Sequence, residues 1–224
     1  MKDFASVDVS QRLQELRIQP GAYGCYSKRA FDVMLALLLM PLVAPVVGIL
    51  WLLVKRGGGS GFYAQERVGM NGSTFQCWKL RTMVPDAETV LGNLCARDAK
   101  VAAEWHRNQK LANDPRITRV GAFLRATSLD ELPQLWNVLR GEMSFVGPRP
   151  FMLSQEALYR SAGGEAYFQM RPGITGPWQV NGRGTTSFVD RVTFDTAYCR
   201  RLSFAKDLQL IFKTAGVVFR CGGQ

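Results

Sequence analysis

The amino-acid sequence predicts an α/β fold that is mostly helical, with one membrane helix and a compact domain that contains a small β-hairpin. Three observations lead to this prediction: an uncharged run at 33–54, an Asn-Gly turn between two strand-like runs, and an apolar stripe with helical spacing near the C-terminus. The chain has 224 residues, enough for one ordinary domain together with a membrane element. We expect an N-terminal extension at 1–24, the membrane helix at 25–56 and the compact domain at 57–224.

The composition of the chain indicates which kinds of binding partner suit its charge and which cellular compartment suits its cysteines. The chain carries 28 lysines and arginines against 18 aspartates and glutamates, a formal net charge of +10, with a pI near 9.7. This charge suits a nucleic acid, lipid headgroups or a phosphorylated substrate, without choosing among them. The five cysteines are widely spaced and lack a C-x-x-C pair, so they predict reduced thiols in a cytosolic compartment rather than a disulfide framework or a zinc site. The single histidine, His106, is expected on a solvated helix face.

The uncharged run from Val33 to Val54 is long enough to cross a membrane. As a straight helix it would measure about 33 Å, against a hydrocarbon core of about 30 Å. Basic pairs stand at both ends, Lys28-Arg29 and Lys55-Arg56, and the positive-inside rule assigns both ends to the cytoplasm. Pro45 removes a backbone donor and divides the run into halves too short to span. On the residues alone, a re-entrant hairpin and a span are equally supported, and a buried core helix is less so.

Strand and helix signals follow after a glycine-rich loop. Phe62–Val68 and Thr74–Leu80 are strand-like and meet around Asn71-Gly72, a strong signal for the turn of a β-hairpin. From Pro85 to about Lys110 the sequence is helix-like, with acidic residues early and basic residues late, as the helix dipole favours. The predicted order is therefore a hairpin followed by one helix.

The rest of the chain predicts short helices and many loops. One helix leads into Arg125, the chain breaks at Thr127-Ser128, and a second helix ends at Gly141 before a proline-flanked loop. Loops dominate residues 163–187. The segment 204–220 has an apolar stripe with lysines beside it, which fits a helix in the membrane interface and an ordinary amphipathic core helix equally well.

Adjacent carboxylates, Asp130 and Glu131, occur where the second of these helices is predicted to start. The plainest interpretation is a capping box, in which Ser128 and Glu131 satisfy free backbone groups. The alternative is chemical, because a helix N-terminus lowers the pKa of a carboxylate and attracts phosphate. Without further information the capping interpretation is favoured.

Several cations lie next to glycine or proline rather than on a regular charged helix face. Such loops often bind phosphate, and Arg149 between two prolines could place its guanidinium on phosphate oxygens at low entropic cost. Each signal is weak by itself, since a solvated arginine on a stiff turn has the same sequence. The candidates are Lys79, Arg81, Arg125, Arg149, Arg171 and Arg183.

Six motifs in this order resemble a known family, the bacterial sugar transferases. They are "KRAFD", "YAQERVG", "WKLRTM", "TSLDELPQLWNVLRGEMSFVGPRP", "RPGITGPWQVNGRG" and "FDTAYCRR". Members are monotopic phosphoglycosyl transferases that start polysaccharide assembly on undecaprenyl phosphate, and the resemblance covers about residues 25–224. The region around 86–112 and "GITGPWQV" look most like the exopolysaccharide-initiating subgroup, whose members transfer galactose 1-phosphate or glucose 1-phosphate.

The resemblance implies a place in the cell and a topology. The family's membrane helix is re-entrant and bent at a Ser-Pro pair, which is Ala44-Pro45 here, so Pro45 is the expected bend and the serine is absent. With the symmetric basic flanks, this favours re-entry on the cytoplasmic face of the bacterial inner membrane, with further amphipathic helices in the interface. Many members have additional N-terminal spans, and this chain is expected to be a minimal catalytic form.

The resemblance also implies a two-step displacement. Asp130 matches the nucleophile that attacks a UDP-sugar and releases UMP, Glu131 matches the second member of the dyad, and Asp130 matches the ligand of the magnesium that the family uses. An ionised carboxylate needs no histidine to activate it, in agreement with the residues. Asp195 and the cations named above match motif positions and are expected to contact substrate. The expected partners are a UDP-sugar, undecaprenyl phosphate and membrane lipid, not nucleic acid, and a homodimer is compatible with the resemblance.

Two other functions compete with this one. A basic, membrane-anchored binding module without catalysis explains the charge and the apolar anchor but not the order of the motifs. A glycosyltransferase that breaks the glycosidic C–O bond would release UDP instead of UMP. The leaving nucleotide separates the two enzymes, and any turnover excludes the module. The sequence leaves open the sugar, the oligomeric state, the pathway and the role of residues 1–24.

Overall fold

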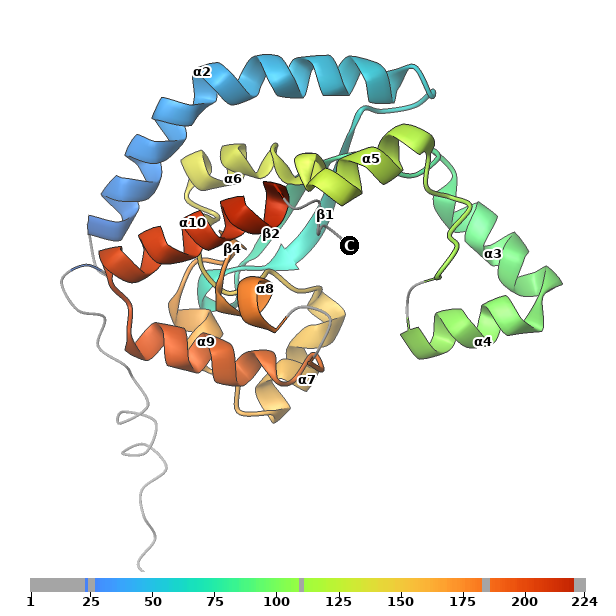
Figure 1. The fold of residues 1–224 in the computed structure, drawn as a ribbon. Helices are drawn as coiled ribbons and strands as arrows, with labels where there is room; N and C mark the ends of the chain where they lie inside the picture. Colours follow the sequence, from blue (N-terminus) through green and yellow to red (C-terminus); the bar gives the residue numbers. More distant parts are fainter. Residues whose placement is uncertain (1–22, 24–26, 109–110, 183–185, 220–224) are drawn as a thin grey trace, which may run out of the picture. The chain divides into compact units, whose positions relative to one another are not determined.

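The computed structural model describes residues 23, 27–108, 111–182 and 186–219 (Figure 1). These residues form two compact units, each assembled from segments that lie far apart in the sequence. The described parts of 1–37, 66–76 and 137–215 belong to the first unit, and those of 38–65, 77–136 and 216–224 belong to the second. Some elements pass from one unit into the other.

Helices predominate, as predicted, and the strands are short. The α-helices are α2 (Lys28–Lys55), α3 (Ala87–Arg97), α4 (Ala99–Asn108), α5 (Arg119–Thr127), α6 (Gln134–Arg140), α7 (Glu156–Ser161), α8 (Pro177–Asn181), α9 (Arg191–Arg200) and α10 (Phe204–Phe219). The strands are β1 (Phe62–Val68), β2 (Thr74–Leu80), β3 (Ser144–Val146) and β4 (Gly173–Thr175). Short 3₁₀ helices include η2 (Met70–Gly72) and η3 (Leu129–Glu131).

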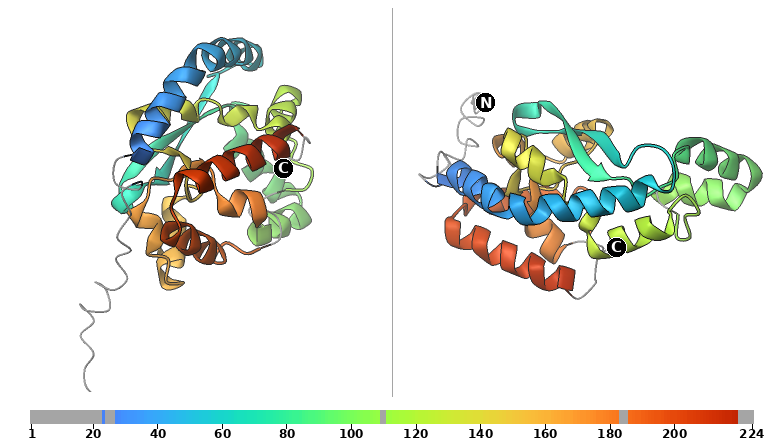
Figure 2. Two further views of the ribbon diagram at one scale, coloured as in Figure 1. Left: turned by 60° about the vertical axis from the view of Figure 1, so that its left-hand side comes forward. Right: turned by 90° about the horizontal axis from the view of Figure 1, so that it is seen from above.

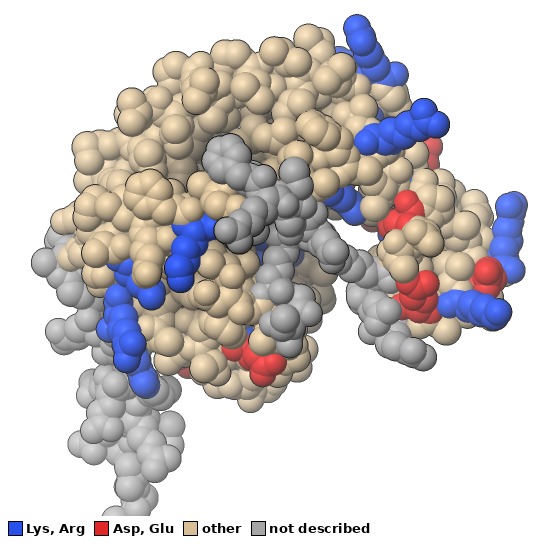
Figure 3. Space-filling view, viewed as in Figure 1, with Lys and Arg blue, Asp and Glu red and all other residues tan. Residues whose placement is uncertain are grey.

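Helix α2 is continuous through both of its prolines, Pro41 and Pro45. Pro45 therefore does not divide α2 into two separate helices, because each proline removes only one backbone hydrogen bond and the other bonds of the helix remain. The bend at Pro45 stays a prediction. An 18-residue window of α2 has a mean hydropathy of 2.7 and is only 11% buried. A core helix of a soluble protein would be mostly buried, so the low burial of α2 disfavours this interpretation. Figure 3 shows uncharged side chains over α2, with basic side chains where the helix ends.

The start of α2 is fastened to the first unit by its charged residues. Arg29 donates to the carbonyl oxygen of Val138 in the last turn of α6 at 2.6 Å. Asp32 is buried, and one of its oxygens accepts hydrogen bonds from the Ser144 hydroxyl and the Phe145 amide, both at 3.0 Å. Two charged residues of the "KRAFD" motif thus have structural partners, Arg29 in α6 and Asp32 in β3.

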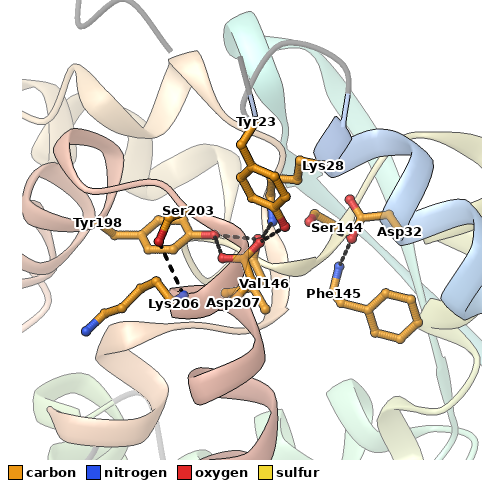
Figure 4. Close-up of polar contacts among 10 residues, drawn as sticks. All are labelled: Tyr23, Lys28, Asp32, Ser144, Phe145, Val146, Tyr198, Ser203, Lys206 and Asp207. Carbon is orange, nitrogen blue, oxygen red and sulfur yellow. Dashed lines mark hydrogen bonds and ion pairs between the residues drawn. The ribbon is translucent and has the colours of Figure 1, made fainter. Parts of the chain in front are cut away.

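A buried carboxylate, Asp207 of α10, holds the same end of α2. Lys28 forms an ion pair with Asp207 at 2.5 Å, and the hydroxyls of Tyr198 and Tyr23 donate to it at 2.6 Å and 2.9 Å. Figure 4 shows these side chains converging on Asp207. Because the carboxylate is paired and fully hydrogen-bonded, its burial is compatible with a stable core.

The C-terminal part of α2 belongs to the second unit and packs against its other elements. Leu50 and Val54 of this helix form a buried apolar cluster with Leu80 of β2 and Leu124 of α5. Arg81 follows β2 and donates from Nη2 to the carbonyls of Val54, at 3.2 Å, and of Gly58. This guanidinium therefore caps the C-terminal end of α2, where the last carbonyls of a helix lack intrahelical donors.

The β-hairpin is confirmed with its predicted bounds, because β1 and β2 form a two-stranded sheet. Asn71 and Gly72 both have positive φ, 59° and 75°, which is the conformation that the Asn-Gly signal predicts. A second sheet was not predicted. β3 and β4 pair in parallel, with Ser144 opposite Gly173 and Val146 opposite Thr175.

The segment predicted as one helix from Pro85 to about Lys110 is two helices, α3 and α4, which pack side by side (Figure 2). Asp98 lies between them with extended backbone angles, and its carboxylate accepts a hydrogen bond from the Lys100 amide at 2.8 Å. Asp98 ends α3 because its extended backbone lets the side chain cap the start of α4. The spacing of apolar residues carries no information about such a cap, so the sequence predicted one helix. Lys110 itself lies outside the described residues.

Helix α10 has two different faces. Leu210 packs in the core of the first unit with Val146 and Tyr198, whereas the side chains of Phe204 and Phe212 are 47% and 72% exposed. The predicted apolar stripe is therefore divided between the core and an outer face. This outer face is the part of α10 that fits the predicted membrane interface.

Candidate active site

Asp130 and Glu131 lie in a tight turn between two helices. Helix α5 ends at Thr127, Ser128 adopts a left-handed conformation with φ 57° and ψ 17°, and η3 follows. Among the described residues, Ser128 makes no side-chain capping bond to η3, so the capping-box interpretation is wrong. Helix α6 begins only at Gln134, so the carboxylates belong to η3 and not to the first turn of a longer helix. The left-handed residue turns the chain sharply and holds both carboxylates on this short segment.

The two carboxylates differ in environment. Asp130 is 9% exposed and ranks among the buried polar residues. Glu131 forms an ion pair with Lys79, with 2.7 Å between Oε1 and Nζ, and both side chains are partly exposed. Burial raises the pKa of Asp130; the charge of Lys79 opposes the shift, the charge of Glu131 adds to it, and Arg125 opposes it. Asp130 is thus a desolvated carboxylate beside a fixed cation, the environment that suits an oxygen nucleophile at neutral pH.

Three predicted cations belong to the same unit as the dyad, and they have different partners. Lys79 contacts Glu131 from the end of β2. Arg125, in the last turn of α5, donates from Nε to the Thr82 hydroxyl at 2.9 Å, and its charge acts on Asp130. Arg81 turns to the end of α2, as described above. The structure therefore brings Lys79 and Arg125 together with the dyad, and substrate contact by any of the three stays a prediction.

The remaining predicted residues belong to the first unit or lie outside the described residues. Arg171 donates from Nε to the Gly141 carbonyl at 2.8 Å, and burial followed by the charge of Arg29 lowers its pKa. Asp195 is 2% exposed and accepts a 2.6 Å hydrogen bond from the Tyr159 hydroxyl; burial raises the pKa of Asp195 to about 7. These contacts give both residues structural roles.

Arg149 follows β3 in the "GPRP" loop and is partly exposed, and Arg183 lies outside the described residues. Substrate contact by Arg149, Arg171, Arg183 and Asp195 stays a prediction.

Comparison with known proteins agrees with the motifs. Residues 23–221 match the sequence model described as bacterial sugar transferase. The chain belongs to the bacterial sugar transferase family. It is 48% identical over 199 residues to a "UDP-galactose-lipid carrier transferase" of Erwinia amylovora, covering 88% of this chain and 41% of that protein.

Two further relatives differ in length. The "Exopolysaccharide production protein ExoY" of Sinorhizobium fredii is 46% identical over 196 residues, covering 87% of this sugar transferase and 86% of that protein. A "UDP-glucose:undecaprenyl-phosphate glucose-1-phosphate transferase" of Escherichia coli is 40% identical over 195 residues, covering 84% of this chain and 39% of that protein. The chain therefore spans about two fifths of the length of some relatives and most of the length of another.

The donor set of the sugar transferase fits magnesium bound together with a substrate. Within the described residues there is no group of three or more His, Cys, Asp or Glu side chains that could hold a metal ion. Magnesium usually binds through one or two carboxylates plus substrate phosphates, and it keeps several waters. The adjacent carboxylates of Asp130 and Glu131 supply this number of protein ligands.

Lys79→Met is expected to move the acidic limb of the pH–rate profile to higher pH. The prediction that Asp130 is the nucleophile implies that activity needs its ionised form and rises with pH through the pKa of this carboxyl. Lys79 holds that pKa down, and its removal leaves burial and the Glu131 charge, both of which raise it. The measurement is kcat/KM for nucleotide release against pH, with exposed Lys100→Met as the control. An unmoved limb in Lys79→Met would show that Asp130 does not set it.

Sequence reasoning missed one residue with notable surroundings, Arg191. Its guanidinium lies over the ring of Trp178 at 3.9 Å and over that of Phe188 at 4.8 Å. A signal existed in the sequence, because Arg191 precedes Asp195 by four residues, which places both on one face of α9.

Proposed function

We propose that this sugar transferase moves a hexose 1-phosphate, of the galactose or glucose type, from a UDP-sugar to undecaprenyl phosphate. The observation that carries the proposal is the buried Asp130 in the η3 turn, next to the Glu131–Lys79 ion pair. The names of the relatives support the donor, the lipid acceptor and a role in exopolysaccharide production.

The reaction has two displacements at one phosphorus. In the first, a carboxylate oxygen of Asp130 attacks the sugar-bearing phosphorus, the bond from that phosphorus to the bridging oxygen breaks, and UMP leaves with this oxygen. The product is an aspartyl ester of the sugar phosphate. In the second, an oxygen of undecaprenyl phosphate attacks the same phosphorus, and the Asp130 carboxylate leaves. Undecaprenyl-diphospho-sugar is formed, and the enzyme is restored.

Neighbouring groups reduce the repulsion between anions in both steps. Lys79 and Arg125 place positive charge near Asp130, where phosphate oxygens gain negative charge. Asp130, with Glu131 beside it, would hold magnesium, which when bound screens the charge of the diphosphate. Glu131 holds Lys79 through the 2.7 Å ion pair. Its proposed further role is to accept or donate a proton during the reaction.

Helix α2 is proposed to enter and leave the inner membrane on its cytoplasmic face. The support is the exposed apolar surface of α2, its basic residues at both ends and two prolines four residues apart. In a cysteine-free background, Ser27→Cys and Ser60→Cys should both react with an impermeant maleimide only from the cytoplasmic side. Labelling of one position from the opposite side would establish a span instead.

The identity of the released nucleotide tests the function. Protein in nanodiscs with undecaprenyl phosphate and magnesium is given a panel of UDP-hexoses, and UMP and UDP are quantified separately. UMP release that depends on one hexose supports the proposal and identifies the sugar. UDP release would indicate cleavage of the glycosidic C–O bond, and absence of turnover across the panel would favour a binding module.

A further inference from the structure

The "WKLRTM" motif contains a buried threonine, Thr82, that contacts both ends of helix α5. Thr82 is 8% exposed and lies two residues after β2. Its carbonyl oxygen accepts hydrogen bonds from the amide and the hydroxyl of Thr118, the N-cap of α5, at 3.0 Å and 3.4 Å. Its hydroxyl accepts from Nε of Arg125, in the last turn of α5, at 2.9 Å. The backbone of Thr82 thus meets the start of α5, and its side chain meets the end.

The contact at the start of α5 is made by backbone atoms of Thr82. A Cβ atom at Gly121 would lie 1.9 Å from the Thr82 carbonyl oxygen and 2.6 Å from its carbonyl carbon. Only a residue without a side chain allows this approach, because no rotamer change moves the two backbone atoms. The Gly121 amide also donates to the Thr118 hydroxyl at 2.9 Å. The start of α5 is therefore held against Thr82 independently of the Thr82 hydroxyl.

The Thr82 hydroxyl holds a mobile side chain beside the dyad segment. An arginine side chain has many rotamers, and a hydrogen bond to Nε fixes one edge of its planar guanidinium. Arg125 precedes Asp130 by five residues, and the Ser128 amide donates to the Arg125 carbonyl at 3.2 Å where the chain turns sharply. Burial raises the pKa of Asp130, and the Arg125 charge opposes this shift. The bond from Thr82 therefore fixes a cation within electrostatic reach of the dyad.

A second carboxylate near Arg125 is already paired. The oxygens of Asp114 accept from Nε and Nη2 of Arg116 at 2.8 Å and 2.6 Å, and both side chains are 6% exposed. Burial raises the pKa of Asp114, but the hydrogen bonds and charge of Arg116, and then the charge of Arg125, lower it overall. Asp114 attracts Arg125 while its hydrogen bonds go to Arg116, so the bond to Thr82 decides where the Arg125 guanidinium lies.

We propose that Thr82 is a positioning residue for sugar-phosphate transfer, because its hydroxyl orients the Arg125 guanidinium toward the reaction at Asp130. This inference rests on the proposed function, in which Arg125 reduces the repulsion between the carboxylate and the phosphate group. A hydroxyl suits the role, since it accepts from Nε without neutralising the guanidinium as a carboxylate would. Thr82 acts through Arg125 and is not expected to touch the substrate.

The kinetic test is a double-mutant cycle that follows UMP release in nanodiscs with the active UDP-hexose. Thr82→Val removes the hydroxyl, keeps the branched shape and should lower kcat/KM about 10-fold or more, as expected for a lost hydrogen bond to a charged group. Thr82→Ser retains the hydroxyl and should stay within about threefold of the unchanged protein. In an Arg125→Met background, Thr82→Val should cost about twofold or less, because the group that Thr82 holds is already absent.

The pH profile separates positioning from packing. Burial raises the pKa of Asp130, the charges of Lys79 and Arg125 oppose the shift, and that of Glu131 adds to it. Arg125 released from Thr82 opposes the shift less, so Thr82→Val should move the acidic limb of kcat/KM to higher pH.

Thr175→Val is the matched control for the loss of a buried hydroxyl. Thr175 is 5% exposed in the first unit, and its hydroxyl pairs with that of Thr214. This variant should lose stability as Thr82→Val does and leave the acidic limb in place. An equal movement of the limb in both variants would reduce Thr82 to a packing role and overturn the proposal.

A measurement without turnover tests the contact itself. In protein labelled with ¹⁵N-arginine, the Arg125 Nε–H should give a slowly exchanging NMR signal that Thr82→Ser keeps and Thr82→Val loses, with Arg125→Met as the assignment. Persistence of this signal in Thr82→Val, or additive losses of kcat/KM in the cycle, would overturn the proposal while UMP release upholds the proposed function. If Thr82→Val does not fold, Thr82→Ala decides by the same criteria. A signal that depends on Thr82 in a protein that releases no UMP would keep the contact and reject the proposed function, and the positioning role with it.

Discussion

Asp130→Asn is expected to lower kcat for UMP release by on the order of 10⁴–10⁶-fold, the range seen when a covalent catalyst loses a member of its machinery. Asparagine has the size of aspartate, so the buried site keeps its packing, but the neutral amide cannot form the ester with the sugar phosphate. The unchanged enzyme, quenched with donor but without acceptor, should carry the mass of one hexose phosphate, and the variant should carry none.

Asp86→Asn is the matched control, because Asp86 is exposed and makes no capping bond with its side chain in the described structure. It should retain full activity. Turnover of Asp130→Asn within tenfold of the unchanged enzyme, with UMP as product, would rule out the covalent intermediate on Asp130. If Asp130→Asn lost activity but still carried the same adduct, the nucleophile would have to be another residue.

The parts of the fold that depend on local sequence could be predicted. The hairpin bounds follow from alternating strand residues and an Asn-Gly turn, and the outcome agrees residue for residue. The motif drew attention to Asp130 and Glu131, whose catalytic role stays a prediction, and the structure adds the contact of Glu131 with Lys79, 52 residues away. A strong turn signal and a rare motif are both contained in a few consecutive residues, so they can be recognised without knowledge of tertiary contacts.

The parts that depend on tertiary contacts could not be predicted. β3 and β4 have three residues each, too few to show an alternating pattern, and they pair across nearly 30 positions. Arg81 and Arg171 were predicted to contact substrate because of their motifs, and this stays a prediction. What the motifs did not reveal is that both guanidinium groups donate to backbone carbonyls that only the fold brings near. The left-handed Ser128 likewise gave no signal, since serine is also a common helix cap.

Gly173→Ala is expected to cost about 3 kcal/mol or more of the free energy of unfolding and to abolish turnover through loss of the fold. A Cβ atom at Gly173 would lie 2.1 Å from the Gly147 nitrogen and 2.5 Å from the Thr175 oxygen. Both are backbone atoms, so no side-chain rotation relieves the contact. The Gly173 amide also donates to the Pro148 carbonyl at 2.8 Å, and a separation of the strands would break this bond.

The close approach of these glycines explains why two motifs far apart in the sequence behave as one structural element. The "GPRP" loop starts at Gly147 and the "RPGITG" segment contains Gly173, and their backbones touch without side chains between them. Gly92→Ala is the control, because a Cβ there meets nothing within 4 Å and alanine favours helix α3 by up to about 1 kcal/mol. Thermal unfolding in nanodiscs, followed by tryptophan fluorescence, should therefore separate the two variants in opposite directions. Equal stability of Gly173→Ala and the unchanged protein would show that the β3–β4 backbones can move apart without cost, and the placement of Arg149 and Arg171 by this contact would then have to be abandoned.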